Sequence, residues 1–211
     1  MKKNDIYKTL LGRIVNLQYK PGEILNEQLL CQEFNVSRTP IREVLMQLAD
    51  FDFVTIKPKV ATTVSEIDWR MLKYLYEIKT PLEGLACELA GTRVTPEEIQ
   101  QLESIVEELR TFSKNGKKTF AYYHDKDSEF HTICHRASRN QFVEKYLAEI
   151  NLKSRRFLHY IDYKIDELDW YTETLNSILE SLKDHDGERA KQEVINHNQS
   201  FLKKLSEYFF G

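Results

Sequence analysis

The first fifty residues alternate between apolar and polar positions with the period of an α-helix. The first apolar series advances in steps of three or four residues: Ile6, Leu10, Ile14 and Leu17. Such spacing puts the side chains on one helix face, and the Lys-Pro-Gly turn at 20–22 predicts the end of that helix. A second helix is predicted after Asn26, and a third after Ser37, because both residues can cap a helix. Pro40 falls in the first turn of the third helix, where a missing N–H costs no hydrogen bond.

The pattern changes after residue 49. Residues 53–64, FVTIKPKVATTV, are rich in β-branched side chains and are interrupted by Lys57, Pro58 and Lys59. This pattern predicts a two-stranded hairpin with a basic tip. Three helices followed by such a hairpin indicate a winged helix-turn-helix.

From residue 67 onward the sequence reads as helical throughout. Six helices are predicted, at about 69–90, 95–113, 118–137, 140–164, 171–183 and 188–209. Thr95 and Glu98 form a capping-box pattern. The short connections predict an antiparallel bundle. The fold class is therefore mainly α, with a winged helix-turn-helix at 1–66 and a helical domain at 67–211.

Composition narrows the picture. The net charge is -3 and the pI about 6.1, so any basic surface must be local. Residues 1–66 hold nine Lys or Arg and eight Asp or Glu, net +1, whereas the remainder holds 21 and 25, net -4. The three cysteines are far apart and form no Cys-x-x-Cys pair. We expect a cytoplasmic protein, because there is no signal-peptide pattern and no apolar run of about 18 residues.

The predicted third helix has two chemically different sides. Four apolar residues are expected to face the core: Ile41, Val44, Leu45 and Leu48. Arg38, Thr39 and Arg42 lie on the opposite side, near the N-terminal end. Recognition helices enter the major groove with that end leading, and Arg can bind guanine with two hydrogen bonds. A capped surface helix with solvated arginines is the alternative; the preceding turn and the basic hairpin favour DNA binding.

Three segments together resemble the DNA-binding domain of GntR-type transcription regulators: PGEILNEQLL, NVSRTPIREVLMQL and FVTIKPKVATTV. The resemblance implies contacts to a palindromic operator. It assigns them to Ser37, Arg38, Thr39 and Arg42 on the helix, and to Lys57 and Lys59 on the wing.

Two positions depart from the family pattern. Asp52 stands where the family has Gly, but Asp tolerates the left-handed conformation better than most residues. Val60 and Ala61 replace a common Arg-Gly pair at the wing tip, which removes a groove or phosphate contact. Either the affinity for DNA or the operator preference is therefore expected to be unusual.

The predicted helix 118–137 carries a polar stripe at steps of three, four and four: His124, Asp127, His131 and His135. Asp127 and His131 are spaced i, i+4 and can bind one metal ion. His124 and His135 are about 16 Å apart along the axis, so these two histidines cannot both bind the same ion. A stripe of hydrogen-bonded histidines without metal is the alternative.

Three further segments resemble the FCD ligand-binding domain of the FadR branch, in its shorter six-helix class: PLEGLACELA, DSEFHTICHRASRN and DGERAKQEVINHN. The resemblance implies dimerisation and a divalent metal (Zn, Ni or Mn) that, with nearby basic residues, holds a small carboxylate effector. Asp127, His131 and His197 match three ligand positions. Lys79 matches a basic position, and Arg155 and Arg156 are further candidates for the cavity.

The fourth ligand position holds Leu175, which cannot coordinate a metal. Three ligands with water, a substitute from His135 or His124, and a metal-free site all remain open. We expect a homodimeric, DNA-binding repressor that responds to a small organic acid. The alternative is a regulator whose helical domain is only a dimerisation scaffold. A metal-dependent hydrolase is disfavoured, because no HExxH motif accompanies these residues.

Overall fold

The computed structural model describes residues 2–114, 120–161 and 169–210. The chain divides into two compact units, residues 1–69 with 155–162, and residues 70–154 with 163–211. The main segment of the first unit ends close to the predicted boundary at 66/67. The predicted ends of helices at 118 and 164 fall outside the described residues.

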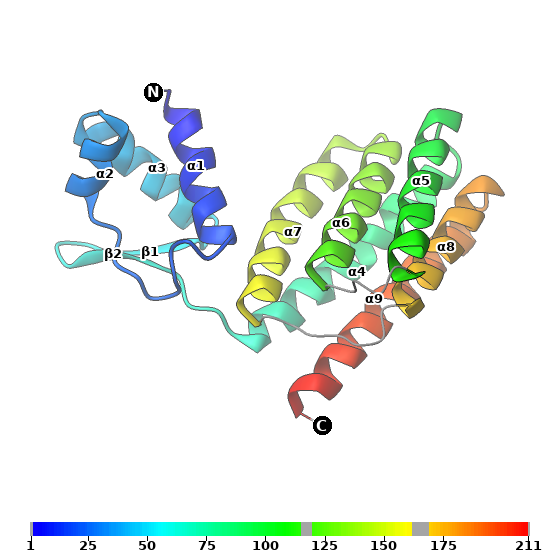
Figure 1. Cartoon of the computed structure of the whole chain (residues 1–211). Coiled ribbons are helices and arrows are strands. Elements are labelled where there is room, and N and C mark those ends of the chain that lie inside the picture. The colour runs from blue at the N-terminus through cyan, green and yellow to red at the C-terminus, as the bar shows by residue number, and fades with distance from the viewer. Residues whose placement is uncertain (1, 115–119, 162–168, 211) are drawn as a thin grey trace. The chain divides into compact units, whose positions relative to one another are not determined.

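The first unit contains the three helices and the wing that the sequence predicts (Figure 1). The helices are α1 (Lys3–Val15), α2 (Glu27–Phe34) and α3 (Arg38–Asp50). Strands β1 (Val54–Lys57) and β2 (Ala61–Val64) pair antiparallel, with Val54 opposite Val64 and Lys57 opposite Ala61. The backbone before α2 adds to the wing through a bridge between Ile24 and Thr63. The chain entering α2 is thereby hydrogen-bonded to the wing.

Local signals explain most of these boundaries. The Asn26 side chain accepts hydrogen bonds from the N–H groups of Gln28 and Leu29 at the start of α2. Asn35 ends α2 in the left-handed conformation, with φ 50°. Asp52 is also left-handed, with φ 57°, as expected where the family has Gly. The conformation is compatible with Asp because its short polar side chain tolerates this region.

Two details of the sequence prediction are wrong. The first helix ends at Val15, so Leu17 lies beyond it with φ 57°. Ser37 occupies the N-cap position of α3, but its side chain makes no capping hydrogen bond. The predicted core face of α3 is confirmed, since its four apolar residues are all buried: Ile41, Val44, Leu45 and Leu48.

The second unit is a helical bundle (Figure 1). Its helices are α4 (Trp69–Gly91), α5 (Pro96–Lys114), α6 (Phe120–Ala137), α7 (Gln141–Ile161), α8 (Asp169–Lys183) and α9 (Gly187–Phe210); Trp69 and the end of α7 group with the first unit. Helix α8 packs against α5 and α9, and α5 packs against α6. The end of α4 meets the start of α9 so closely that a Cβ on Gly91 would lie 2.5 Å from Gly187 Cα. Among the described residues, no helix is long and apolar enough to cross a membrane.

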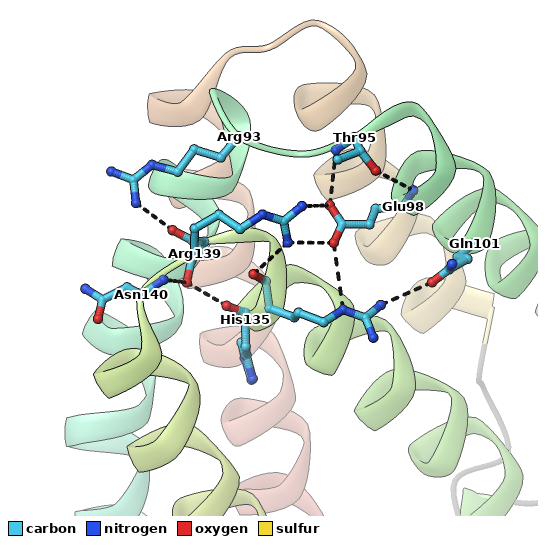
Figure 2. Close-up of polar contacts among 9 residues, drawn as sticks. Arg93, Thr95, Glu98, Gln101, His135, Arg139 and Asn140 are labelled. Atoms are coloured by element: carbon cyan, nitrogen blue, oxygen red, sulfur yellow. Dashed lines mark hydrogen bonds and ion pairs between the residues drawn. The ribbon is translucent and has the colours of Figure 1, made fainter.

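A polar cluster joins the start of α5 to the turn between α6 and α7 (Figure 2). The capping box is confirmed: the Thr95 N–H donates to Glu98 Oε2 at 3.1 Å, and the Glu98 N–H donates to Thr95 Oγ1 at 3.3 Å. Arg139 donates to both Glu98 oxygens at 2.8 Å. Arg93 Nη1 donates to the Ser138 carbonyl at 2.6 Å. These bonds fix the corner from which α6 and α7 extend.

Candidate nucleic-acid interface and metal centre

The N-terminal end of α3 presents polar side chains to solvent. All four residues assigned to DNA contact on this helix are exposed: Ser37, Arg38, Thr39 and Arg42. The buried face of the same helix anchors it in the core, so the exposed end is held on a rigid element. Helix N-termini attract phosphate, because their N–H groups are unpaired and the helix dipole is positive there.

The wing supplies the other two predicted contact residues. Lys57 and Lys59 are both exposed, and Lys59 sits in the turn with φ 62°. Arg42, Lys57 and Lys59 line one surface cleft between α3 and the wing, together with Glu27. Val60, at the tip, is 79% exposed, so the apolar departure from the family pattern faces solvent. The structure thus brings Arg42 of α3 and the two wing lysines around a shared groove, whereas Arg38 lies outside its lining.

Glu27 was missed in the sequence analysis. Arg42 Nε donates to Glu27 Oε2 at 2.9 Å, and the two residues are 15 apart in the chain. The link depends on how α2 and α3 cross, which no local pattern contains. The acidic residue in the first turn of α2 was the only available signal.

The bundle brings the three predicted metal ligands together. Asp127 and His131 come from α6, and His197 comes from α9; all three are buried. His131 Nε2 lies 3.3 Å and His197 Nε2 lies 3.1 Å from Asp127 Oδ1. The three potential ligand atoms lie within 4.8 Å of one another, which is close enough to bind one ion.

Unsatisfied atoms support a metal at this point. Asp127 Oδ1 and both ring nitrogens of His131 are buried and make no well-aligned hydrogen bond among the described residues, although Asp127 Oδ1 is within ion-pair distance of both histidines. Buried polar atoms nearly always make such a hydrogen bond. Two imidazole nitrogens and one carboxylate oxygen suit zinc and related divalent metals, and three protein ligands leave a position open. The residues present therefore fit a divalent metal ion.

Thr174 controls the orientation of His197. Its hydroxyl donates to the Tyr171 carbonyl at 2.9 Å and lies 2.8 Å from His197 Nδ1. With its proton on the Tyr171 carbonyl, the Thr174 hydroxyl can accept a hydrogen bond from an Nδ1–H of His197. In that tautomer the Nε2 lone pair would be available to a metal ion bound beside Asp127. Such outer contacts are typical of metal-ligating histidines.

Leu175, next to Thr174, is fully buried in the apolar core. The position therefore contributes packing, as expected for a leucine at the family's fourth ligand position. The proposed substitutes lie elsewhere: His135 Nε2 is 3.2 Å from Glu83 Oε1, and His124 lines a small cavity. Glu83, His131 and His135 form a second group of three potential ligands that shares His131 with the first.

Glu83 is a second residue that the sequence analysis did not assign. Its Oε1 lies 3.7 Å from Lys79 Nζ and 3.7 Å from His131 Nδ1, and its Oε2 accepts from Asn198 Nδ2 at 2.8 Å. Because these partners already occupy it, Glu83 is better placed to orient His131 than to bind the ion. Its Asn198 partner is 115 residues away, beyond any local signal.

The charges of this cluster are strongly coupled. Burial opposes ionisation of Glu83, yet Lys79 and His131 hold the pKa of its carboxyl well below the usual range. Burial alone would lower the pKa of His131, but Glu83 and Asp127 raise it to about 9. A metal ion at Nε2 would have to displace that proton, so uptake is expected to weaken at low pH.

The two predicted effector residues lie in different places. Lys79 is buried, its Nζ lies 4.8 Å from the centre of the Tyr76 ring, and it lines the small cavity beside Asp127 and His131. Arg155 is half-buried on α7 and is not part of that lining. Asn151 and Ser154, which are also on α7, do line the small cavity. Of the two, only Lys79 adjoins the candidate metal centre.

Comparisons with known proteins agree with this geometry. Residues 2–64 match the gntR family of bacterial regulatory proteins, and residues 74–200 match the FCD domain. The chain belongs to the GntR family, with an FCD domain after its DNA-binding domain.

Relatives of this GntR-family chain are transcription regulators. It is 30% identical to the uncharacterized HTH-type transcriptional regulator YdhC of Bacillus subtilis, over 96% of this chain and 92% of that protein. It is 26% identical to the HTH-type transcriptional regulator McbR of Escherichia coli, over 87% and 84%. The chain is therefore a DNA-binding transcription regulator and not an enzyme, which confirms the two expectations from sequence.

Solved structures share the fold. E. coli McbR/YncC superposes with a TM-score of 0.80 at 23% identity, over 98% of both chains. A putative GntR regulator from Rhodococcus sp. RHA1 gives 0.75 at 15% identity, also over 98% of both. At these identities the likeness extends to the fold of this GntR-family protein and not to its ligand.

Proposed function

We propose that this GntR-family regulator is a cytoplasmic homodimeric repressor that reads a pseudo-palindromic operator. The observation that carries the proposal is the exposed, polar N-terminal end of α3 beside the basic wing. Arg38 and Arg42 read bases in the major groove, Ser37 and Thr39 hold phosphates, and Lys57 and Lys59 follow the backbone. Two copies related by a two-fold axis would read two half-sites.

An apolar surface of the bundle supports the dimer. Exposed large side chains line one face of α4 and the adjoining face of α7: Tyr74, Ile78, Leu85, Phe142 and Tyr146. The two helices are neighbours, because Leu82 and Ala86 of α4 pack against Val143 and Leu147 of α7. Contiguous exposed apolar surface is typical of interaction sites. A second copy of the same surface would cover it.

Ile78→Asp tests this interface. The expected result is a monomer in sedimentation equilibrium, because a carboxylate would be buried without a partner. Lys203→Ala makes the same charge change on an exposed side chain of α9 and should leave the dimer intact. A dimeric Ile78→Asp protein would place the interface elsewhere.

The bundle is proposed to hold a divalent ion through Asp127, His131 and His197. The ion would supply an open coordination position for the carboxylate of a small organic acid, and buried Lys79 adds a positive charge nearby. Effector binding can change the affinity for DNA only as far as the effector itself binds one conformation of the dimer more tightly than the other. We expect release from the operator.

Elemental analysis of untagged protein decides between this role and a scaffold bundle. One Zn, Ni or Mn per chain is expected, and His131→Ala should lose it while keeping its helical circular dichroism. His185→Asn alters a histidine that contacts the Gly91 carbonyl, away from the cluster, and should keep the ion. Equal metal in all three proteins would exclude the site, and metal-free protein with no acid-induced melting shift would favour the scaffold.

A further inference from the structure

We propose that Glu27 is a positioning residue that sets the guanidinium of Arg42 for reading one base pair in each half-site. The inference rests on the proposed function, in which Arg42 contacts DNA. It adds a residue of α2 to the specificity of α3.

The geometry of the pair leaves the reading edge of the arginine open. Glu27 Oε2 accepts from Arg42 Nε at 2.9 Å. The guanidinium has further N–H groups on Nη1 and Nη2, whose planar fork matches guanine O6 and N7. A carboxylate at Nε therefore restrains the plane of the group without occupying the fork. A contact through both terminal nitrogens would have blocked it.

Glu27 is the more fixed member of the pair. Its side chain is 32% exposed, whereas that of Arg42 is 60% exposed. It is the first residue of α2, where the positive end of the helix favours a carboxylate. The Asn26 side chain bonds the next two backbone N–H groups, so the start of α2 is well defined. A mobile arginine is thus restrained by an anchored acid.

The surroundings make an acid at this position costly for general DNA affinity. Glu27 lines the cleft that also contains Arg42, Lys57 and Lys59, and its negative charge repels phosphate. An exposed ion pair adds little to folding stability. The contribution that remains is pre-organisation, in which the arginine loses its rotamer freedom before DNA arrives. Glu27 should therefore lower non-specific affinity and raise discrimination.

The test uses the full-length protein and an operator selected from a random duplex library. Every base pair of one half-site is then substituted, and the preference at each position is measured by fluorescence anisotropy. Arg42→Ala should flatten the preference at one position. Glu27→Ala should reduce the preference at that same position by about two- to tenfold, the gain from immobilising one long side chain in advance, with unchanged or tighter binding to random duplex.

Glu43→Ala is the matched control. Glu43 is an exposed acid of the same domain, paired with Lys3 at 3.0 Å, so its removal makes the same charge change. It should tighten binding to all sequences alike and leave base preference unaltered. The double variant Glu27→Ala/Arg42→Ala should be no less selective than Arg42→Ala, because Glu27 acts through Arg42.

The outcomes separate the inference from the function on which it rests. If Arg42→Ala flattens a base preference but Glu27→Ala behaves like Glu43→Ala, Glu27 acts only through its negative charge. The inference about Glu27 is then overturned, while the assignment of Arg42 as a base reader stands. If Arg42→Ala changes no preference, the assignment of Arg42 as a base reader fails and the inference fails with it. Circular dichroism of each variant guards against a loss of fold.

Discussion

The two regions with candidate chemistry differ in where their charges lie. Around α3 the ion pairs are exposed, as in Arg42 with Glu27, whose side chains are 60% and 32% exposed. In the bundle, the side chains of Lys79 and Glu83 are only 8% and 0% exposed. Exposed pairs contribute little to stability and are easily exchanged for a ligand. Buried pairs cost desolvation and hold one geometry, so that removing one member leaves a stranded charge.

The largest expected effect follows from breaking the buried pair. Glu83→Ala should lower the free energy of unfolding by about 3–5 kcal/mol, because Lys79 is left buried without its carboxylate. Urea melts followed by circular dichroism measure this. Glu88→Ala, also on α4, breaks the partly exposed pair with Lys191 of α9 and should cost under about 1 kcal/mol. Equal losses for the two variants would erase the distinction between the regions.

On the exposed side, the same kind of truncation should act on binding and not on folding. Arg38→Ala should weaken operator binding by about 1–3 kcal/mol if Arg38 reads a base, and relax specificity at one position. Losses below a few tenths of a kcal/mol for both Arg38→Ala and Arg42→Ala would rule out α3 as the reading helix.

The wing should act differently from α3. Lys57→Ala should weaken binding to all sequences and reduce the slope of log affinity against log salt concentration by about 1.

Replacing the Thr174 hydroxyl tests whether residues that contact the proposed ligands, but do not bind the ion, affect metal affinity. Thr174→Val keeps the shape of the side chain and removes the hydroxyl that lies 2.8 Å from His197 Nδ1. Metal affinity should fall by about 10–100-fold, as for other outer contacts, with little change in helical content. Isothermal titration with Zn²⁺ measures the change. Ser177→Ala removes a hydroxyl bonded to the Glu173 carbonyl on the same helix, and its affinity should match the parent protein.

The smallest effect is expected at the corner of Figure 2, where the buried Glu98 carboxylate meets the exposed Arg139. Burial raises the pKa of Glu98, but the hydrogen bonds from Arg139 and Thr95 outweigh it and lower the pKa. The carboxylate therefore stabilises the fold above the pKa of an unfolded Glu, about 4.3, and this stability is lost as the pH falls through the folded pKa. Glu98→Gln should cost about 1 kcal/mol at pH 7 and less at pH 3. A cost that does not change with pH would assign the corner to packing alone.

The first region was largely predictable from sequence, because its signals are local. Helical periodicity fixed the core face of α3, and Asn26 and Asp52 fixed turns through their own backbone preferences. Ser37 shows the limit: its type and position indicate a cap, yet the side chain makes no capping bond.

The buried cluster was predictable only in part. The spacing of Asp127 and His131 on one helix gave half of the site, and resemblance added His197. Glu83 and Thr174 were missed, because their partners His135 and His197 lie 52 and 23 residues away, and the contacts depend on how α4 packs with α6 and α8 with α9. The sequence also did not show that the polar stripe on α6 makes two separate sets of contacts. His131 and His135 both approach Glu83 of α4, whereas Asp127 contacts His197 of α9.

The contact between Gly91 and Gly187 also bears on how the protein tolerates mutation. Neither position has room for a single carbon atom, since a Cβ on Gly187 would lie 2.4 Å from the Glu88 carbonyl oxygen. Gly12 on α1 has nothing within 4 Å of its Cβ direction and should accept Ala with a gain in helix propensity. A saturation library should therefore lose nearly every variant at 91 and 187 and retain nearly every small side chain at 12. The seam between the first and last helices of the bundle is thus a place to avoid when grafting new sensing specificities onto this scaffold.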